Sequence, residues 1–179
     1  HRSTFFLFSQ VRKLTYLQSL GYDISWASFS IIEVMSQPRF GHKRIGYLAA
    51  SQSFTDDTDV LLLTTNLFKK EFGSRNIYEV GSALNCLSNV ANSELARDLM
   101  PDVVTLVSHS NPYVRKKALL ALYKLYFKYP QGLRATFDRV KERLSDSEGS
   151  VIGCAVNVIC ELAHANPRNY LNMAPKFFT

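Results

Sequence analysis

The stretch NPYVRKKALLALYKLYFKYP, residues 111–130, decides the fold of this chain, because a related stretch follows it at a fixed distance. The second stretch is EGSVIGCAVNVICELAHANP, residues 148–167, and an offset of 37 residues aligns the two. The alignment pairs identical residues, which are Val114 with Val151, Ala118 with Ala155, Leu125 with Leu162 and Pro130 with Pro167. Self-similarity at such a period is typical of repeat proteins that stack small helical units.

Two stretches nearer the start of the chain fit the same frame. RNIYEVGSALNCLSNV, residues 75–90, matches the 111–130 stretch at an offset of 35. HKRIGYLAA, residues 42–50, matches RKKALLALY, residues 115–123, at an offset of 73. A period near 37 lies between the lengths of tetratricopeptide and HEAT or armadillo repeats, and the tetratricopeptide pattern of Trp, Gly and Tyr is missing. The sequence therefore predicts HEAT-like helix pairs.

The apolar residues of each unit recur at the spacing of an α-helix. In the 111–130 stretch they lie three or four residues apart and form one stripe, which comprises Val114, Ala118, Leu122, Leu125 and Tyr129. Lysines of the same stretch fall on a different face. Small residues at matching positions, Ala83, Ala118 and Ala155, are expected to let neighbouring helices approach closely.

This periodicity predicts about nine helices, with a further helix start near Leu171. The predicted helices span residues 10–20, 24–36, 41–53, 58–72, 76–90, 93–108, 112–129, 133–144 and 149–165. One helix pair cannot bury its apolar face alone, so the pairs stack and their contacts stay local in sequence. We therefore predict an all-α, HEAT/armadillo-like α-solenoid, a right-handed superhelix of antiparallel helix pairs.

The charge of the chain is concentrated in one segment. Of the 179 residues, 46% are hydrophobic and 20% are charged, which is a globular composition with a formal net charge of +6. Residues 110–144 carry nine Lys and Arg against two acidic residues. Such a segment suits an acidic partner, phospholipid headgroups or nucleic acid, and a solvated lysine-rich helix face is the alternative. The run Arg115, Lys116 and Lys117 is the strongest candidate for contact with an acidic partner.

The motifs of an enzyme are missing. The chain contains no G-x-S-x-G nucleophile motif and no phosphate-binding glycine loop. Asp56, Asp57 and Asp59 lack the longer ligand series of a calcium loop, and Cys160 with His164 offers too few ligands for zinc. We therefore predict no catalytic residue, no metal and no cofactor.

Cysteine and tryptophan usage adds three expectations. Three cysteines make no disulfide framework and indicate a reducing compartment. Cys160 is expected to be buried beside a surface His164. Trp26, the only tryptophan, is expected to pack between helices, with a role as an interface anchor as the alternative. The sequence contains no run of 18 apolar residues, so no membrane span is predicted.

Several strings carry a resemblance to a known family. They include KLTYLQSLGYDISWASFSIIEVMS (residues 13–36), KRIGYLAASQSF (43–54), LARDLMPDVVTLVSH (95–109) and AVNVICELAHANPRNYLNMAPKFF (155–178). Together they resemble the trunk of the adaptins, and within these the delta-adaptins of adaptor-related protein complex 3. The resemblance covers roughly residues 11–178, which would be part of the adaptin N-terminal trunk with four to five helical repeats in 11–179.

Residues 1–10, HRSTFFLFSQ, differ from the polar, alanine-containing helical segment of the family. They are therefore set apart as an atypical N-terminal segment. The chain begins at His1 and ends in KFFT, so we expect it to be a piece of a longer protein.

The resemblance implies a scaffold subunit of a heterotetrameric vesicle-coat adaptor complex. Such complexes sort proteins from the Golgi and endosomes to lysosomes and related organelles, and they sit peripherally on the cytoplasmic side of Golgi, endosomal and vesicle membranes. The implied partners are a sigma-type small adaptin, a beta-type large adaptin, a mu-type medium adaptin, an Arf-family GTPase and an anionic membrane surface. In alpha-adaptin, basic residues of the segment that matches Val11–Leu14 contact phosphoinositides, and here that segment offers Arg12 and Lys13.

Two other kinds of binding protein fit the periodicity. One is another HEAT-repeat scaffold, such as a transport receptor or a phosphatase scaffold. The other is a nucleic-acid-binding solenoid, which would need aromatic side chains free to stack on bases. Tyr123, Tyr126 and Tyr129 fall on or near the apolar stripe instead, so we expect no nucleic-acid partner.

Overall fold

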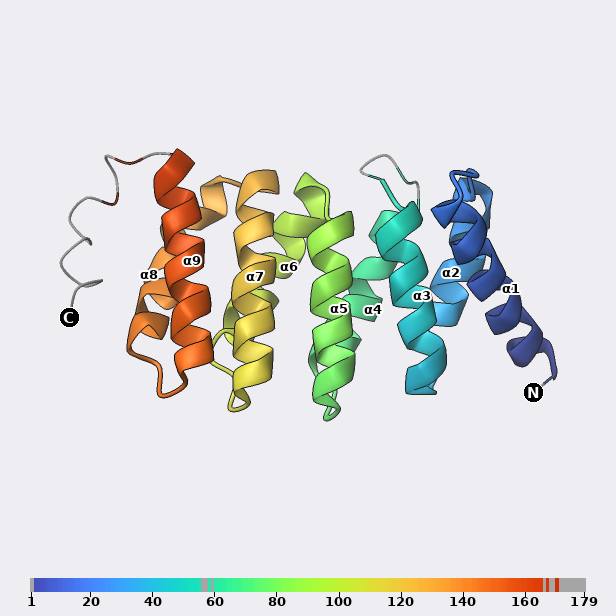
Figure 1. Ribbon diagram of the computed structural model, residues 1–179, viewed down its shortest axis with the longest axis horizontal. Helices are drawn as coiled ribbons and strands as arrows, with labels where there is room; N and C mark the ends of the chain where they lie inside the picture. Colours follow the sequence, from blue (N-terminus) through green and yellow to red (C-terminus); the bar gives the residue numbers. More distant parts are fainter. Residues whose placement is uncertain (1, 56–57, 59, 166, 168–169, 171–179) are drawn as a thin grey trace.

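The computed structural model describes residues 2–55, 58, 60–165, 167 and 170, and over these residues the chain is helical without strands (Figure 1). The helices are α1 (Arg2–Ser19), α2 (Ser28–Met35), α3 (Phe40–Ser53), α4 (Thr65–Phe72), α5 (Ile77–Val90), α6 (Ser93–Leu106), α7 (Pro112–Lys128), α8 (Gln131–Glu142) and α9 (Gly149–Ala165). Three short 3₁₀ segments accompany them, namely η1 (Ser25–Ala27), η2 (Leu61–Thr64) and η3 (Arg143–Ser145). The predicted helices are confirmed within a few residues except for two: α1 begins well before residue 10, and α4 begins at Thr65 and not at 58, because Leu61–Thr64 form η2. The start predicted near Leu171 lies outside the described residues.

The first helix begins earlier than predicted. It starts at Arg2 and not near residue 10, and it passes through residues 2–10 without a break. This stretch holds no Gly or Pro that would stop a helix. Leu7 and Phe8 also pack against the core, and the ring of Phe8 stacks on His42 of α3 with centroids 4.3 Å apart. These tertiary contacts therefore stabilise the extension of α1 toward the N-terminus.

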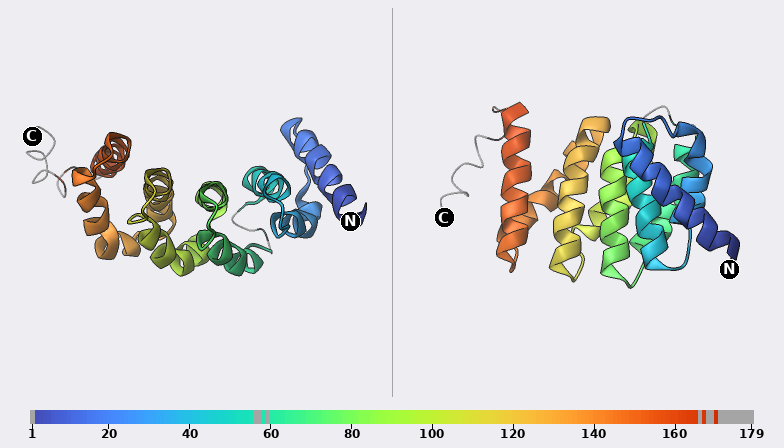
Figure 2. Two further views of the ribbon diagram at one scale, coloured as in Figure 1. Left: turned by 90° about the horizontal axis from the view of Figure 1, so that it is seen from below. Right: turned by 45° about the vertical axis from the view of Figure 1, so that its right-hand side comes forward.

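The helices form two layers of a curved solenoid, as predicted. Helices α3, α5, α7 and α9 lie side by side in the front layer, with α1 at the N-terminal end, and α2, α4, α6 and α8 lie behind them (Figure 1). Successive helices run in opposite directions. Seen along the helices, the stack bends so that the odd-numbered helices line its concave face and the even-numbered ones its convex face (Figure 2).

Polar caps define where several helices begin. The side chains of Asn76, Asn92 and Asn111 precede α5, α6 and α7, and each accepts a hydrogen bond from a backbone N–H of the first turn at 2.9 to 3.0 Å. Pro112 follows Asn111 at the first helical position of α7, where its missing N–H costs nothing. These caps define the residue at which each of the three helices begins.

The buried positions of the concave layer share one register. Gly46, Ala83, Ala118 and Ala155 occupy the same place in α3, α5, α7 and α9, and all four are buried. The burial pattern aligns α3 with α7 at an offset of 72, which corrects the predicted offset of 73. The predicted offset would place the half-buried Ile45 on the fully buried Ala118.

The smallest residue of this register, Gly46, lies close to the backbone of α2. A Cβ atom added to Gly46 would lie 2.5 Å from the backbone nitrogen of Met35 in α2, which is closer than packed atoms can be. The expectation concerned Ala83, Ala118 and Ala155, which are buried, and at the equivalent Gly46 an added methyl group would collide with α2. Helices α2 and α3 are held together at this point.

Two expectations about single residues are wrong. Trp26 is 73% exposed and does not pack between helices. It lies in η1, where Ala27 and Ile24 point into the core and Trp26 is left on the outer side. Cys160 is exposed and not buried, because the inward positions of α9 are taken by Val158, Ile159 and Leu162.

Replacing Gly46 with Ala should destabilise the fold by about 1–3 kcal/mol, the usual cost of overpacking a tight contact. Gly41→Ala in the same helix is the matched control, because an added Cβ there meets nothing within 4 Å. Since Ala has the higher helix propensity, this control should be neutral or stabilising by up to about 1 kcal/mol. Urea unfolding followed by circular dichroism measures both, and equal effects of the two changes would contradict the close approach at Gly46.

Candidate functional site

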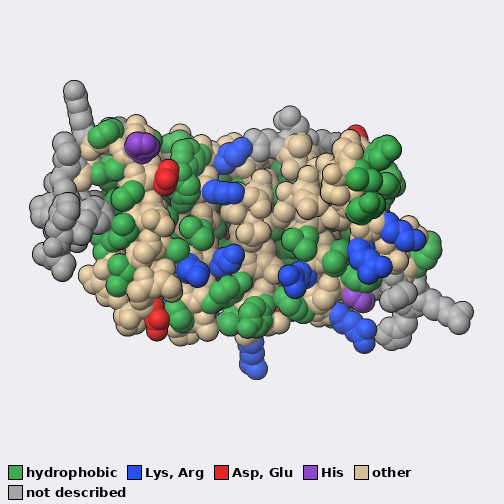
Figure 3. Space-filling model, viewed as in Figure 1, with side chains coloured by type: hydrophobic (Ala, Val, Ile, Leu, Met, Phe, Trp, Pro, Cys, Tyr) green, Lys and Arg blue, Asp and Glu red, His purple; other side chains and the backbone are tan. Residues whose placement is uncertain are grey.

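The concave face is formed by the outward sides of the odd-numbered helices (Figure 2). In α7 its outward stripe is spaced four, three, four and three residues apart and comprises the half-buried Tyr113 and Lys117 and the exposed Leu120, Lys124 and Phe127. This stripe lies opposite the buried residues of the same helix, so stacking holds it outward. Basic side chains are spread over this face and acidic ones are few (Figure 3).

One register position of the concave face alternates in chemistry from helix to helix. It is occupied in turn by Leu48, Asn85, Leu120 and Asn157 on α3, α5, α7 and α9, and all four are exposed. The leucines are 42% and 41% exposed, so they present apolar contact area between hydrogen-bonding amides. Mixed apolar and polar groups on a curved face are typical of protein-binding surfaces.

Hydrogen bonds link neighbouring helices across this face. Lys124 Nζ of α7 donates to Asn89 Oδ1 of α5 at 2.8 Å. The hydroxyl of Tyr123 donates to Glu161 Oε2 of α9 at 3.5 Å. Partial burial, followed by the nearby Glu161 carboxylate, raises the pKa of Tyr123, so its hydroxyl remains a donor. These contacts tie successive helices together at the surface.

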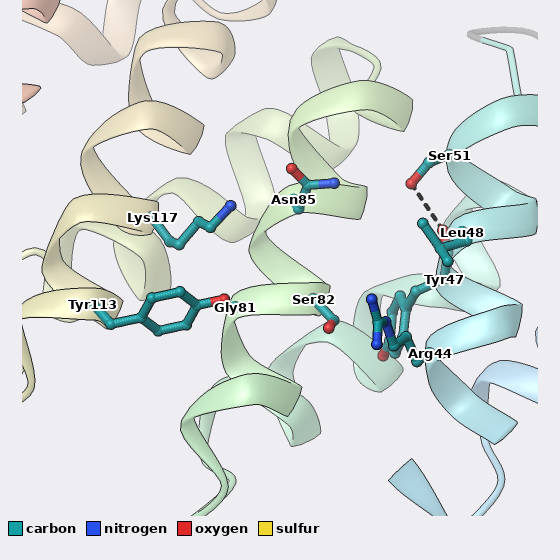
Figure 4. Close-up of a pocket in the computed structure, with 9 residues that line it drawn as sticks. All are labelled: Arg44, Tyr47, Leu48, Ser51, Gly81, Ser82, Asn85, Tyr113 and Lys117. Carbon is teal, nitrogen blue, oxygen red and sulfur yellow. Dashed lines mark hydrogen bonds between the residues drawn. The ribbon is translucent and has the colours of Figure 1, made fainter. Parts of the chain in front are cut away.

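A hollow of about 200 Å³ opens on the concave face between α3, α5 and α7 (Figure 4). Arg44 comes from α3 and Lys117 from α7, and the side chain of Lys117 reaches toward α5 in the view. The residues with polar side chains that line the hollow are Arg44, Tyr47, Ser51, Ser82, Asn85, Tyr113 and Lys117. The hollow is therefore polar and carries two positive charges.

A buried ion cluster joins α3 to the two helices beside it. Lys43 Nζ lies 2.9 Å from Glu71 Oε1 of α4 and 3.2 Å from Glu79 Oε1 of α5, and both Lys43 and Glu71 are buried. The hydroxyl of Ser74 donates to Glu79 at 2.5 Å. Because every charge in this cluster has a partner, it serves the packing of three helices and offers nothing to a ligand.

Of the predicted basic run, Arg115 turns inward. It is 7% exposed, and its guanidinium donates to the carbonyls of His109 and Ser110 at 2.9 and 2.8 Å and to Asp146 Oδ1 at 2.7 Å. Burial raises the pKa of the Asp146 carboxyl, but the hydrogen bond from Arg115 and the charge of Arg143 outweigh it and hold the pKa below its usual value. Arg115 is thus committed to the packing of the α7 and α9 ends.

The other predicted site residues lie in two separate places. Lys116 and Lys117 are half-buried on α7, and Lys117 lines the hollow. Arg12 and Lys13 are exposed on α1, at the far end of the row of helices from α7 and α9 (Figure 1). The structure therefore does not bring the five predicted basic residues into one patch.

Sequence reasoning missed the residues that complete the hollow. Arg44, Tyr47 and Asn85 stand on helices other than that of Lys117, and only the register between repeats relates them. A second hollow, of about 390 Å³, lies beside Trp26, Phe29 and Val60 on the α2 and η2 side. Alignment of α3 on α5 and α7 at the correct offset is the signal that could have found the first hollow.

Metal and membrane features can be assessed over the described part of the chain. There, no cluster of three His, Cys, Asp or Glu side chains is arranged to hold a metal ion. Asp56, Asp57 and Asp59, considered above as a calcium loop, lie outside the described residues. None of the described helices combines the length and apolar character that crossing a membrane requires.

The sequence matches a family model described as the adaptin N terminal region over residues 8–179. It is 58% identical over 168 residues to the AP-3 complex subunit delta-1 of Bos taurus, and the match covers 94% of this chain and 14% of that protein. The identity to the AP-3 complex subunit delta of Dictyostelium discoideum is 54%, with 94% and 15% covered. The AP-1 complex subunit gamma-1 of Mycosarcoma maydis is 33% identical, with 86% and 18% covered. The chain thus spans less than a fifth of the length of these relatives.

Structural comparison agrees with the family assignment and with the fold. A chain of a homology model of the full-length AP-3 complex in an intermediate open conformation superposes with a TM-score of 0.85 at 43% identity, covering 96% of this chain and 30% of that one. A designed armadillo repeat protein in complex with the peptide (KR)4 superposes with a TM-score of 0.61 at 18% identity, covering 87% and 74%. The second likeness is one of fold alone, and it agrees with the α-solenoid.

Replacing Arg115 with Met should lower the free energy of unfolding by about 1–3 kcal/mol, because the Asp146 side chain would lose its closest partner and keep the more distant Arg143. Lys116→Met, one residue along the same helix, should change it by less than about 0.5 kcal/mol. Chemical unfolding of the two variants at neutral pH is the measurement. Similar small losses for both would show that Arg115 belongs to the surface, as the sequence alone suggested.

Proposed function

Because the chain belongs to the adaptin N-terminal family, we propose that it forms part of the trunk of a delta-type large subunit in a heterotetrameric vesicle-coat adaptor complex. The observation that carries this proposal is the 58% identity to an AP-3 delta subunit over 94% of the chain. Residues 11–179 would supply four to five helical repeats of that trunk, after the divergent segment 1–10. The identity to AP-3 subunits speaks against the alternative of a transport receptor or another HEAT-repeat scaffold.

The role proposed for this segment is that of a scaffold. A stack of helices with contacts only between neighbours gives a long curved surface and no enclosed site for chemistry. Its concave face, with the Leu48, Asn85, Leu120 and Asn157 register, is the surface proposed to hold the sigma-type small adaptin. The beta-type large and mu-type medium adaptins complete the proposed complex. No catalytic residue and no cofactor are assigned to this segment.

The proposed process is vesicle-mediated intracellular protein transport from the Golgi and endosomes to lysosomes and related organelles. Its support is the resemblance to AP-3 delta subunits. The proposed location is peripheral, on the cytoplasmic side of Golgi, endosomal and vesicle membranes, with an Arf-family GTPase as recruiting partner. Reduced cysteines fit such a compartment.

Two clusters of basic residues are proposed to meet acidic surfaces. Arg12 and Lys13 are exposed on α1 and are proposed to approach anionic lipid headgroups. Lys116 and Lys117 remain candidates for an acidic partner, whereas the buried Arg115 supports them only through packing. Each Lys or Arg near an anionic membrane contributes about 1 kcal/mol.

The full-length protein that carries this segment should co-purify with a sigma-type small adaptin, together with beta- and mu-type subunits in equal amounts. Affinity purification from cells followed by quantitative mass spectrometry is the measurement. A tagged HEAT-repeat transport receptor from the same cells serves as the control for non-specific capture. Recovery of the tagged protein without any small adaptin would overturn the proposal.

The double change Arg12→Gln and Lys13→Gln should weaken binding to vesicles that contain phosphatidylserine by about 30-fold, the effect of about 2 kcal/mol at two basic positions. The matched control is Lys69→Gln with Lys70→Gln, an equally exposed basic pair on α4 of the convex layer. Flotation of the purified complex at low ionic strength measures both. An equal loss for the two pairs would show that only net charge matters and that α1 does not face the membrane.

A further inference from the structure

Tyr47 carries a hydroxyl group without a partner. Its side chain is 2% exposed and packs against Phe68, with ring centroids 6.0 Å apart. Within the described part of the chain, no group makes a hydrogen bond to its Oη. A buried hydroxyl left in this state costs about 1–3 kcal/mol, and such groups in folded proteins call for an explanation.

The surroundings of Tyr47 keep its hydroxyl a proton donor. Burial, followed by the negative charge of Glu71, raises the pKa of Tyr47 above its ordinary value. The hydroxyl therefore stays protonated at any physiological pH and can donate a hydrogen bond. What it lacks is an acceptor.

The hollow that Tyr47 lines is suited to an acceptor with negative charge. Arg44 and Lys117 stand on its α3 and α7 sides, and neither has a carboxylate within ion-pair distance among the described residues (Figure 4). Ser82 and Asn85 add further donors from α5, which lies between them. Arg44 is exposed, so its side chain can change rotamer when a group enters the hollow that it lines together with Tyr47.

The rim of the hollow favours a protein over a free anion. Leu48 lines the hollow and Leu120 follows Lys117 by one turn, and the two are 42% and 41% exposed on either side of Asn85. Apolar groups contribute nothing to the binding of a phosphate ion, but they gain from burial under a protein surface. The same concave face displays few acidic side chains of its own (Figure 3).

We propose that this hollow is an anchor point for the partner protein on the concave face, and that it receives an Asp or Glu side chain of that partner between Arg44 and Lys117, with the Tyr47 hydroxyl donating to it. This inference rests on the proposed function, which places a sigma-type small adaptin on this face. Hydrogen bonds to a carboxylate from charged and neutral donors together are short and strong. The site would thus combine charge, a buried donor and an apolar rim.

The proposal makes Tyr47→Phe act in opposite directions on the free and the bound protein. In the free subunit the change removes an unpartnered hydroxyl, so the melting temperature should stay the same or rise. In the complex it removes a donor to a carboxylate, so the affinity for the small adaptin should fall about tenfold. A residue with a merely structural role would not show this opposition.

The test uses the full-length subunit and a recombinant sigma-type small adaptin as the probe. Tyr47→Phe, Arg44→Gln and Lys117→Gln should each weaken binding about tenfold, as measured by biolayer interferometry at constant ionic strength. Lys69→Gln removes one positive charge from the convex layer and should leave the affinity within twofold. Arg44 and Lys117 are not fully buried, so these two variants fold even if Tyr47→Phe does not.

A second arm distinguishes a protein carboxylate from a free anion. Inorganic phosphate at 10 mM should not raise the melting temperature of the free wild-type subunit more than that of Tyr47→Phe. Affinity that none of the three changes affects, or a phosphate effect that depends on Tyr47, would overturn this inference and leave the proposed function standing. A wild-type subunit that binds no small adaptin would overturn the proposed function, and this inference with it.

Discussion

Burial of small residues at one register of the concave layer is the constraint on which this structure depends. Gly46, Ala83, Ala118 and Ala155 are all buried at equivalent places of the concave layer, and at Gly46 even a methyl group would collide with α2. Because these positions are buried within the stack, the opposite sides of the same helices are left exposed and form one curved face. Packing in the core and presentation of the surface are thus consequences of a single register.

The sequence predicts the solenoid well because its contacts are local. The apolar stripe that begins at Val114 and recurs at Val151 is buried against the next helix. Such burial requires apolar residues at helical spacing within each unit, so it is visible in the sequence. Two predictions were wrong because they depend on contacts between units. The α1 start depends on Phe8 stacking on His42, and the choice between offsets 72 and 73 depends on whether Gly46 or Ile45 faces α2.

The candidate site was harder to predict, because adjacency along a helix is not adjacency in space. Arg115, Lys116 and Lys117 form one basic run in the sequence. Successive side chains of an α-helix, however, point in directions about 100° apart around its axis. Arg115 therefore turns toward Asp146 while Lys117 faces the hollow. Arg44 and Tyr47, which line the same hollow, come from a helix two units earlier. No local sequence pattern therefore predicts that they share this site with Lys117.

The helices around the hollow differ at one buried register position. One register position holds Lys43 in α3, Val80 in α5 and Arg115 in α7, so buried cations alternate with an aliphatic side chain. A valine packs against many neighbours, but a buried cation is stable only beside the carboxylate that pairs with it. Lys43 pairs with Glu71 of α4 and Glu79 of α5, whereas Arg115 pairs with Asp146 in the segment before α9. Equivalent positions of the repeat therefore make different contacts, and the hollow between α3, α5 and α7 is lined by residues that do not repeat from helix to helix.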